Sequence, residues 1–166
     1  MSKGTRTGLR IEIDIGRQKL TVFDGDTVRM AVSVSTAKNG PGEKMGSECT
    51  PRGQHIVRAK IGADAPVNAV FVGRRFTGEI HTPELAAAHP GRDWILTRIL
   101  WLSGCEVGKN RFGDVDTMRR YIYIHGTPDS VAMGQPGSRG CVRMRNAELL
   151  QLFEMVPPGT PVLIKE

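Results

Sequence analysis

The sequence predicts a mainly β domain that carries one or two short helices. Three observations point to this fold class: apolar and polar residues alternate through the first third of the chain, turn-forming Gly and Pro residues recur at short intervals, and only two segments have a helical pattern. Of the 166 residues, 39% are hydrophobic and 24% are charged, which is typical of a globular domain. We therefore expect residues 1–166 to form one domain, with residues 1–7 as a flexible N-terminal segment.

The N-terminal third predicts a three-stranded meander. Residues 9–15 alternate strictly between apolar and charged side chains, which is the pattern of a half-buried strand. A second strand follows at residues 19–23, and an Asp-Gly hairpin signal leads into a third at residues 27–34. Residues 36–53 are rich in Gly, Pro and polar residues, so we expect a long loop there.

The rest of the chain alternates short strands with two short helices. The segment at 83–88, which starts with Pro, and the segment at 147–155, behind a capping Asn146, are expected to be helical. The apolar segment at 95–102 fits either a strand or a short helix. Further strands are expected at residues 54–61, 69–72, 120–125 and 161–165.

The net charge of +6 favours anionic partners. The Lys and Arg residues are scattered in ones and twos with few aromatic residues among them, so we expect no nucleic acid partner, and ligands that bear carboxylates explain the charge equally well.

We also expect no membrane span, because no apolar run approaches the roughly 20 residues that a spanning helix needs. The N-terminus has no apolar signal-peptide core, which predicts a cytoplasmic protein, or a periplasmic or wall-associated one if another route exports it. The three cysteines fit a reducing compartment, although one disulfide and one free thiol would also be compatible with an odd count.

Two segments combine residues that can carry out covalent chemistry. One ends a strand abruptly at His125 and continues as Gly126-Thr127-Pro128, and the other, residues 138–144, places Cys141 directly after a glycine. A loop with Gly and Pro residues joins the segments and can fold them side by side. A free thiol is mostly protonated at neutral pH, so an imidazole within hydrogen-bonding distance would activate Cys141 by taking its proton. We therefore expect a thiolate–imidazolium pair.

Neighbouring residues would support such a pair. The carbonyl of Gly126 can orient the far nitrogen of the histidine ring, and the amides of Gly140 and Cys141 can point at a developing oxyanion. The positive charges of Arg139 and Arg143 would favour the thiolate. Taken singly, a Cys before a helix is more often inert and a lone His is more often a structural polar residue.

The two segments together resemble the active-site motif of the L,D-transpeptidase (YkuD) family, in which a histidine precedes a Ser/Thr-x-Gly-Cys-apolar-Arg/Asn segment. The similarity extends to Ser35-Thr36-Ala37, to the turn at residues 50–55 and to the closing residues 158–162, and it covers roughly residues 8–165. It implies a β-sandwich-like catalytic domain in which Cys141 is the acyl-forming nucleophile and His125 the base. It also implies that Gly140 and Ser138 belong to the oxyanion and substrate-binding region, with no metal and no cofactor.

One residue departs from the family motif. The family often has a second histidine immediately before the Gly-Cys pair, where this chain has Arg139. A permanent cation cannot shuttle protons, so His125 remains the only base, and Arg139 is expected to face the substrate or to stabilise the thiolate. Other candidates are given structural, surface or loop roles: His55, His81, His89, Cys49, Cys105, Arg98, and Tyr121 and Tyr123, for which core packing is favoured over lining the pocket.

The resemblance implies an acyl transferase that acts on peptidoglycan stem peptides. Cys141 would attack the amide between the third stem residue, commonly meso-diaminopimelate, and D-Ala, and the thioester would pass to water or to an amine of another stem. We favour water, which makes the protein an L,D-carboxypeptidase of muropeptide recycling; cross-linking in the cell wall is the alternative. Carbapenem-type β-lactams would be covalent inhibitors. Two other hypotheses are a papain-like or NlpC-like peptidase, in which the cysteine normally precedes the histidine, and a non-catalytic basic binding module.

Overall fold

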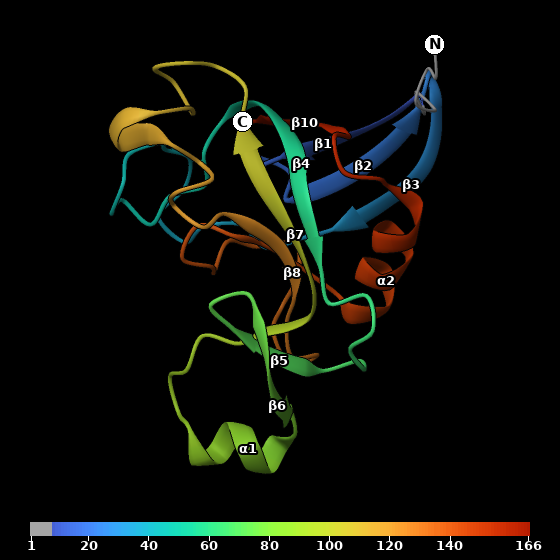
Figure 1. Cartoon of the computed structure of the whole chain (residues 1–166), viewed down its shortest axis with the longest axis vertical. Helices are drawn as coiled ribbons and strands as arrows, with labels where there is room; N and C mark the ends of the chain where they lie inside the picture. Colours follow the sequence, from blue (N-terminus) through green and yellow to red (C-terminus); the bar gives the residue numbers. More distant parts are fainter. Residues whose placement is uncertain (1–7) are drawn as a thin grey trace.

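The computed structural model describes residues 8–166 and confirms a mainly β fold with two short α-helices (Figure 1). The flexible segment expected at residues 1–7 lies outside the described residues. Ten strands form one curled sheet, in which β8 and β9 branch from the path β3-β2-β1-β10-β4-β7-β5-β6. The strands are β1 (Leu9–Asp14), β2 (Lys19–Asp24), β3 (Thr27–Ser33), β4 (Gly53–Ile61), β5 (Ala69–Val72), β6 (Arg75–Ile80), β7 (Ile95–Gly104), β8 (Tyr123–Gly126), β9 (Val142–Met144) and β10 (Pro161–Lys165). The helices are α1 (Pro83–Ala88), the 3-10 turn η1 (Gly113–Val115) and α2 (Asn146–Met155).

The predicted N-terminal meander is confirmed, and the last strand completes it. β1, β2 and β3 pair antiparallel in order, and β10 joins β1 in parallel with Ile11 opposite Val162. Alternate residues of β1 are buried, because the period of two turns Ile11 and Ile13 to the same face. These side chains join the main hydrophobic cluster with Leu149 and Leu152 of α2, so this helix closes one side of the core.

β7 is the strand around which the sheet folds. It pairs antiparallel with β4, β5 and β8, so the segment at 95–102, for which a strand or a helix was expected, is a strand and extends to Gly104. The β5–β6 hairpin joins the sheet only through β5, which pairs with the start of β7, and Figure 1 shows the hairpin and α1 below the main sheet as a separate projection. β6 was not predicted; five of its six residues are exposed, so it carries no alternation of buried and exposed positions.

Two boundaries around the later strands differ from expectation. The strand expected at 120–125 begins only at Tyr123, because residues 117–121 form turns and Tyr121 has a positive φ of 57°. The segment after Cys141 was expected to lead directly into a helix, but residues 142–144 form β9. The helix then starts at Asn146 with Arg145 as its cap, and the Asn146 side chain is instead buried, where it bonds to Thr97 and Thr127.

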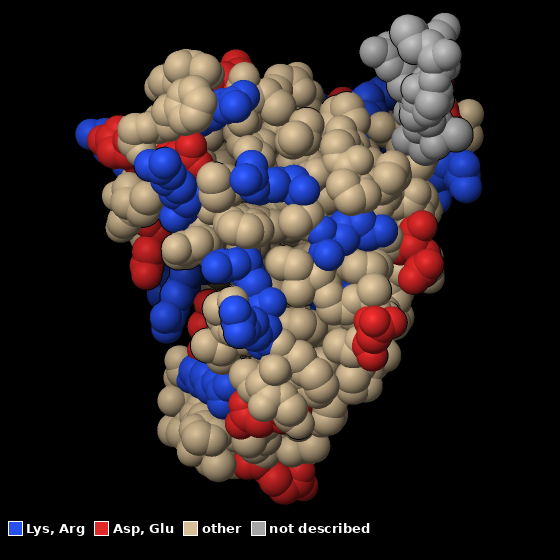
Figure 2. Space-filling model, in the orientation of Figure 1, with Lys and Arg blue, Asp and Glu red and all other residues tan. Residues whose placement is uncertain are grey.

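Within residues 8–166, no helix has the length and apolarity needed to cross a bilayer. Lys and Arg side chains are spread over the face drawn in Figure 2 and do not form one continuous basic patch there. This distribution of basic side chains agrees with the sequence, in which Lys and Arg residues occur singly or in pairs.

Candidate active site

The parallel pairing of β8 and β9 brings the predicted histidine and cysteine segments together. Ile124 lies opposite Val142 and His125 opposite Arg143 in this pair. Because successive side chains of a strand alternate between faces, Ile124 and Val142 enter the main core while the neighbouring residues lie on the opposite face of the sheet. The residues on that face line a cavity of about 430 Å³: Tyr123, His125, Cys141 and Arg143, joined by Ser138 and Arg139.

The β5–β6 hairpin also contributes to the lining of this cavity. Gly73 and Arg74, at the turn of the hairpin, line the cavity together with Asp93. The Arg74 guanidinium donates to the Tyr123 hydroxyl at 3.0 Å and stacks over the Tyr121 ring at 4.9 Å. Core packing was favoured for both tyrosines, but Tyr121 is 54% exposed and both line the cavity, so that expectation is wrong for Tyr121 and incomplete for Tyr123.

The ring of His125 is fixed by one backbone bond. Its Nδ1 lies 2.6 Å from the Gly126 carbonyl oxygen, the orienting contact that was expected of Gly126. Because a carbonyl oxygen only accepts, Nδ1 carries the hydrogen and the lone pair of the neutral ring lies on Nε2. Burial lowers the pKa of His125, with the Gly126 carbonyl acting in the opposite direction. The ring is therefore neutral at pH 7 and can accept a proton.

The thiol of Cys141 is also neutral in the free protein. Burial raises its pKa to about 12, and the Tyr123 amide, Arg143 and Arg120 only partly oppose this effect. The Tyr123 amide donates to Sγ at 3.3 Å, and the thiol donates to the Tyr121 carbonyl at 3.4 Å. The expected thiolate–imidazolium pair is thus corrected to a neutral thiol and a neutral imidazole that line one cavity, since burial disfavours both charges.

Two cations lower the pKa of Cys141. One is Arg143, as expected, and the other is the guanidinium of Arg120, which was not predicted. Arg120 is held near Cys141 by hydrogen bonds to the carbonyls of Gly42 and Cys49, at 3.2 and 2.7 Å. Arg139 lines the cavity, which agrees with the substrate-facing role.

Two side-chain hydroxyl groups form hydrogen bonds with the peptide units around Cys141. Ser138 Oγ accepts from the Gly140 amide at 3.2 Å and donates to the Cys141 carbonyl at 2.5 Å. Thr50 Oγ1 donates to the Gly140 carbonyl at 2.9 Å and accepts from the Ala37 amide at 2.9 Å. The Gly140 amide is therefore hydrogen-bonded to Ser138, and of the two donors expected at the oxyanion site the Cys141 amide is the one without an acceptor among the described residues.

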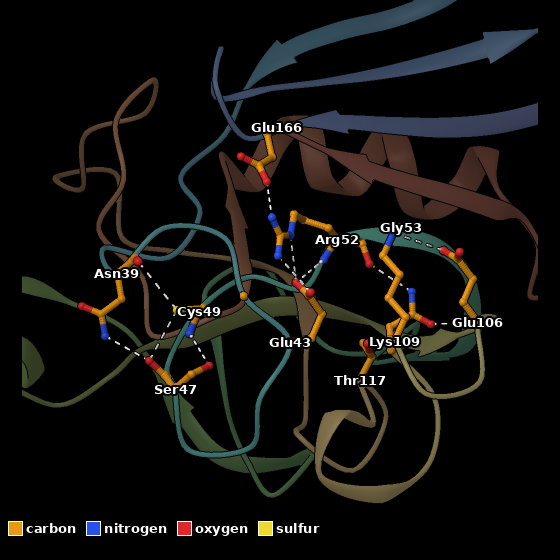
Figure 3. Close-up of polar contacts among 12 residues, drawn as sticks. Asn39, Glu43, Ser47, Cys49, Arg52, Gly53, Glu106, Lys109, Thr117 and Glu166 are labelled. Carbon is orange, nitrogen blue, oxygen red and sulfur yellow. Dashed lines mark hydrogen bonds and ion pairs between the residues drawn. The ribbon is translucent and has the colours of Figure 1, made fainter.

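Ion pairs and hydrogen bonds of charged residues hold the loop that carries Thr50 in place (Figure 3). Arg52 binds the carboxylate of Glu43 through two nitrogens at 3.0 Å and also pairs with Glu166 near the end of the chain. The next segment is held by Glu106, whose carboxylate accepts from the Gln54 amide at 2.8 Å. The expected loop at residues 36–53 thus contacts the Gly140 peptide through Thr50, although none of its residues lines the cavity.

Most of the remaining candidates have structural surroundings. His55 is buried between the Gly53 carbonyl and the Thr117 hydroxyl, and burial lowers its pKa to about 4, which confirms the structural interpretation. Arg98 donates to the carbonyls of Ala65 and Thr97, also as expected. All three cysteines are free, including Cys49 in the loop and the exposed Cys105.

Arg74, Asp93 and Arg120 were missed because nothing in their local sequence marks them. Asp93 lies two residues before β7 and pairs with Arg143 of β9 at 3.2 Å, and it reaches Arg143 because β7 pairs with β8 and β8 with β9. Thr50 was noticed as part of a turn, but its bond to Gly140 spans 90 positions of the chain. These partners depend on contacts between distant segments, which a local motif does not contain.

Comparison with known proteins gives a consistent result. The family model described as the L,D-transpeptidase catalytic domain (YkuD) matches residues 8–164. The Bacillus licheniformis protein YkuD is 44% identical over 46 residues, which are 28% of this chain and 28% of that protein. An L,D-transpeptidase structure from Mycobacterium smegmatis gives a TM-score of 0.56 at 18% identity and covers 96% of this chain and 59% of that one. An L,D-transpeptidase in complex with imipenem gives 0.56 at 17% identity and covers 95% and 58%. The chain thus spans less than two thirds of these relatives, and the structural likeness shows a common fold.

Proposed function

Because the chain belongs to the L,D-transpeptidase (YkuD) family, we propose that Cys141 cleaves the amide between meso-diaminopimelate and D-Ala in peptidoglycan tetrapeptide stems. The observation that carries the proposal is the shared cavity of Cys141 and His125, with the histidine ring held on the Gly126 carbonyl so that Nε2 is free to accept. Family membership supports the class of enzyme. The bond that is cleaved and the acceptor of the acyl group are our proposal.

The first half-reaction starts from the neutral pair. As Sγ of Cys141 bonds to the substrate carbonyl carbon, Nε2 of His125 takes the thiol proton, so no thiolate needs to be stabilised beforehand. The Cys141 amide donates to the oxyanion that forms. The imidazolium then protonates the leaving nitrogen, D-Ala departs, and a thioester remains on Cys141.

The second half-reaction transfers the acyl group to water. His125 takes a proton from water as its oxygen attacks the thioester carbon, and the proton returns to sulfur when the C–S bond breaks. The charges of the cavity support water over an amine: Arg74, Arg139 and Arg143 line it, and Asp93, the carboxylate among the lining residues, is already paired with Arg143. A stem carboxylate is attracted to such a site, whereas the ammonium group of a second stem is repelled.

Transfer to an amine is the second candidate, and the names of the related proteins favour it, since they are described as L,D-transpeptidases. Incubation with a disaccharide-tetrapeptide and mass analysis of the products separates the two reactions. Tripeptide alone supports hydrolysis, and dimers joined through two diaminopimelates overturn it.

The same chemistry predicts a covalent adduct with a carbapenem. The strained lactam carbonyl presents an acyl group to Cys141, and a related structure is described as a complex with imipenem. Intact mass should show one adduct on the wild-type protein and none on Cys141→Ala. An adduct that persists in Cys141→Ala, or tripeptide release by that variant, would exclude Cys141 as the nucleophile.

A further inference from the structure

A second cavity of about 570 Å³ lies beside the catalytic one, and the mechanism above does not use it. His81 and the α1 residues Pro83 and Ala86 form one wall, and residues 128–131, which follow β8, form the other. The two cavities share their dividing segments: Asp93 lines the first and Trp94 the second.

The lining of the second cavity differs in charge from that of the catalytic cavity. No Lys or Arg is among its lining residues within the described part of the chain, although the protein has a net charge of +6. Asp129 supplies a negative charge, and Asn68 and Ser130 supply neutral polar groups, while prolines and Trp94 supply apolar surface. An anionic peptide finds no counter-ion here, so the lining fits a neutral ligand that has hydroxyl or amide groups and an apolar face.

The aromatic wall is held rigidly. The Arg92 guanidinium stacks at 4.5 Å on the Trp94 ring, and Glu79 binds Arg92 through two bonds of 2.8 and 3.3 Å, which neutralises its charge. His81 packs edge-on against Trp94, with 4.9 Å between ring centres. Its Nε2 is buried and has no hydrogen-bond partner among residues 8–166, a state that disfavours the empty site and that a polar ligand can relieve.

We propose that this cavity binds the N-acetylhexosamine of a sugar-linked stem peptide, an inference that rests on the proposed function. A pyranose ring has an apolar face that matches Trp94 and hydroxyl groups that match Asn68 and Asp129. Its acetamido group is uncharged, and its methyl group matches the apolar wall of Pro83 and Ala86. The site would make the enzyme selective for disaccharide-tetrapeptides over free tetrapeptides.

The two tryptophans of the chain allow a direct binding test. The Trp94 indole lies at the cavity, whereas the Trp101 indole donates to the Met118 carbonyl at 3.1 Å and is absent from the cavity lining, so it serves as an internal control. Titration with a peptide-free N-acetylglucosamine disaccharide should shift the Trp94 indole N–H resonance and leave that of Trp101 unchanged. A glucose disaccharide, which lacks the acetamido groups, should shift Trp94 less. No shift of Trp94, or equal shifts of both tryptophans, would overturn the proposal, and this readout does not depend on catalysis.

Kinetics test the same site during turnover. Trp94→Ala should raise KM for the disaccharide-tetrapeptide about tenfold, the effect of losing one well-packed aromatic contact. It should change KM for the free tetrapeptide less than about twofold. Ala86→Phe, which fills the cavity from α1 without removing the aromatic wall, should act in the same way if Trp94→Ala does not fold. An equal rise of KM for both substrates in the variants would mean that the cavity binds the peptide and not the sugar. If the wild-type protein is inactive on both substrates but its Trp94 resonance shifts with the disaccharide, the proposed reaction is refuted and the proposed sugar site is not.

Discussion

The hydroxyl of Thr50 is expected to position Cys141 through the peptide unit of Gly140, to which it is hydrogen-bonded. Thr50→Val keeps the shape of the side chain but removes the only group that bonds to both the Gly140 carbonyl and the Ala37 amide. Thr50 is fully buried, so water does not replace these bonds. Each orphaned group costs about 1–3 kcal/mol, which gives a loss of about 2–6 kcal/mol in the free energy of unfolding.

Thr50→Ser is the matched control, because it keeps both bonds and loses one methyl group. Its cost is about 1 kcal/mol, the value for one buried carbon. Urea unfolding of the two variants should therefore differ clearly, and the rate of carbapenem acylation at neutral pH should fall at least about tenfold in Thr50→Val but remain near wild type in Thr50→Ser. If Thr50→Val unfolds at the same urea concentration as Thr50→Ser and acylates as fast, the two bonds do not support the site and the reasoning fails.

Three further predictions concern the histidines and the glycine of β8. The pKa of His125 is lowered from about 6.5, so kcat/KM should be constant around pH 7 and fall only below pH 6.5 as the ring gains a proton; a midpoint above pH 7 would contradict a buried neutral base. The pKa of His55 is about 4 in the folded protein and about 6.5 in the unfolded chain. The contribution of neutral His55 to the free energy of unfolding is therefore complete above pH 6.5 and is lost as the pH falls towards 4, a loss of about 3 kcal/mol in total. Denaturant titrations at several pH values should show this slope in wild type and a shallower one in His55→Gln. Gly126→Ala should destabilise the fold by about 1–3 kcal/mol, because the added Cβ would meet Asn146 Oδ1 and lie 2.6 Å from the Leu96 carbonyl; thermal unfolding unchanged from wild type would show that β8 can shift.

The parts of the fold and the site that could be predicted from the sequence are those that short, local sequence patterns encode. The meander was predictable because its alternation of side chains is local, and Cys141 and His125 were predictable because each lies in a short motif. The positive φ of Tyr121 and the three residues of β9 left no comparable signal. Asp93 and Arg120 reach the site only through long-range pairing, and the neutral state of the thiol depends on burial, which no local pattern encodes.

The short strand β9 also has a consequence for how the enzyme matures. Its Arg143 exchanges two backbone bonds with Ser35, of 2.9 and 3.0 Å, on one side, while β8 flanks it on the other. Cys141 is thus fixed in place only after segments about a hundred residues apart have met, and such long-range contacts form slowly during folding. We expect the ability to be acylated to arise late in refolding, after the local hairpins, so that covalent labelling of Cys141 reports completion of the fold.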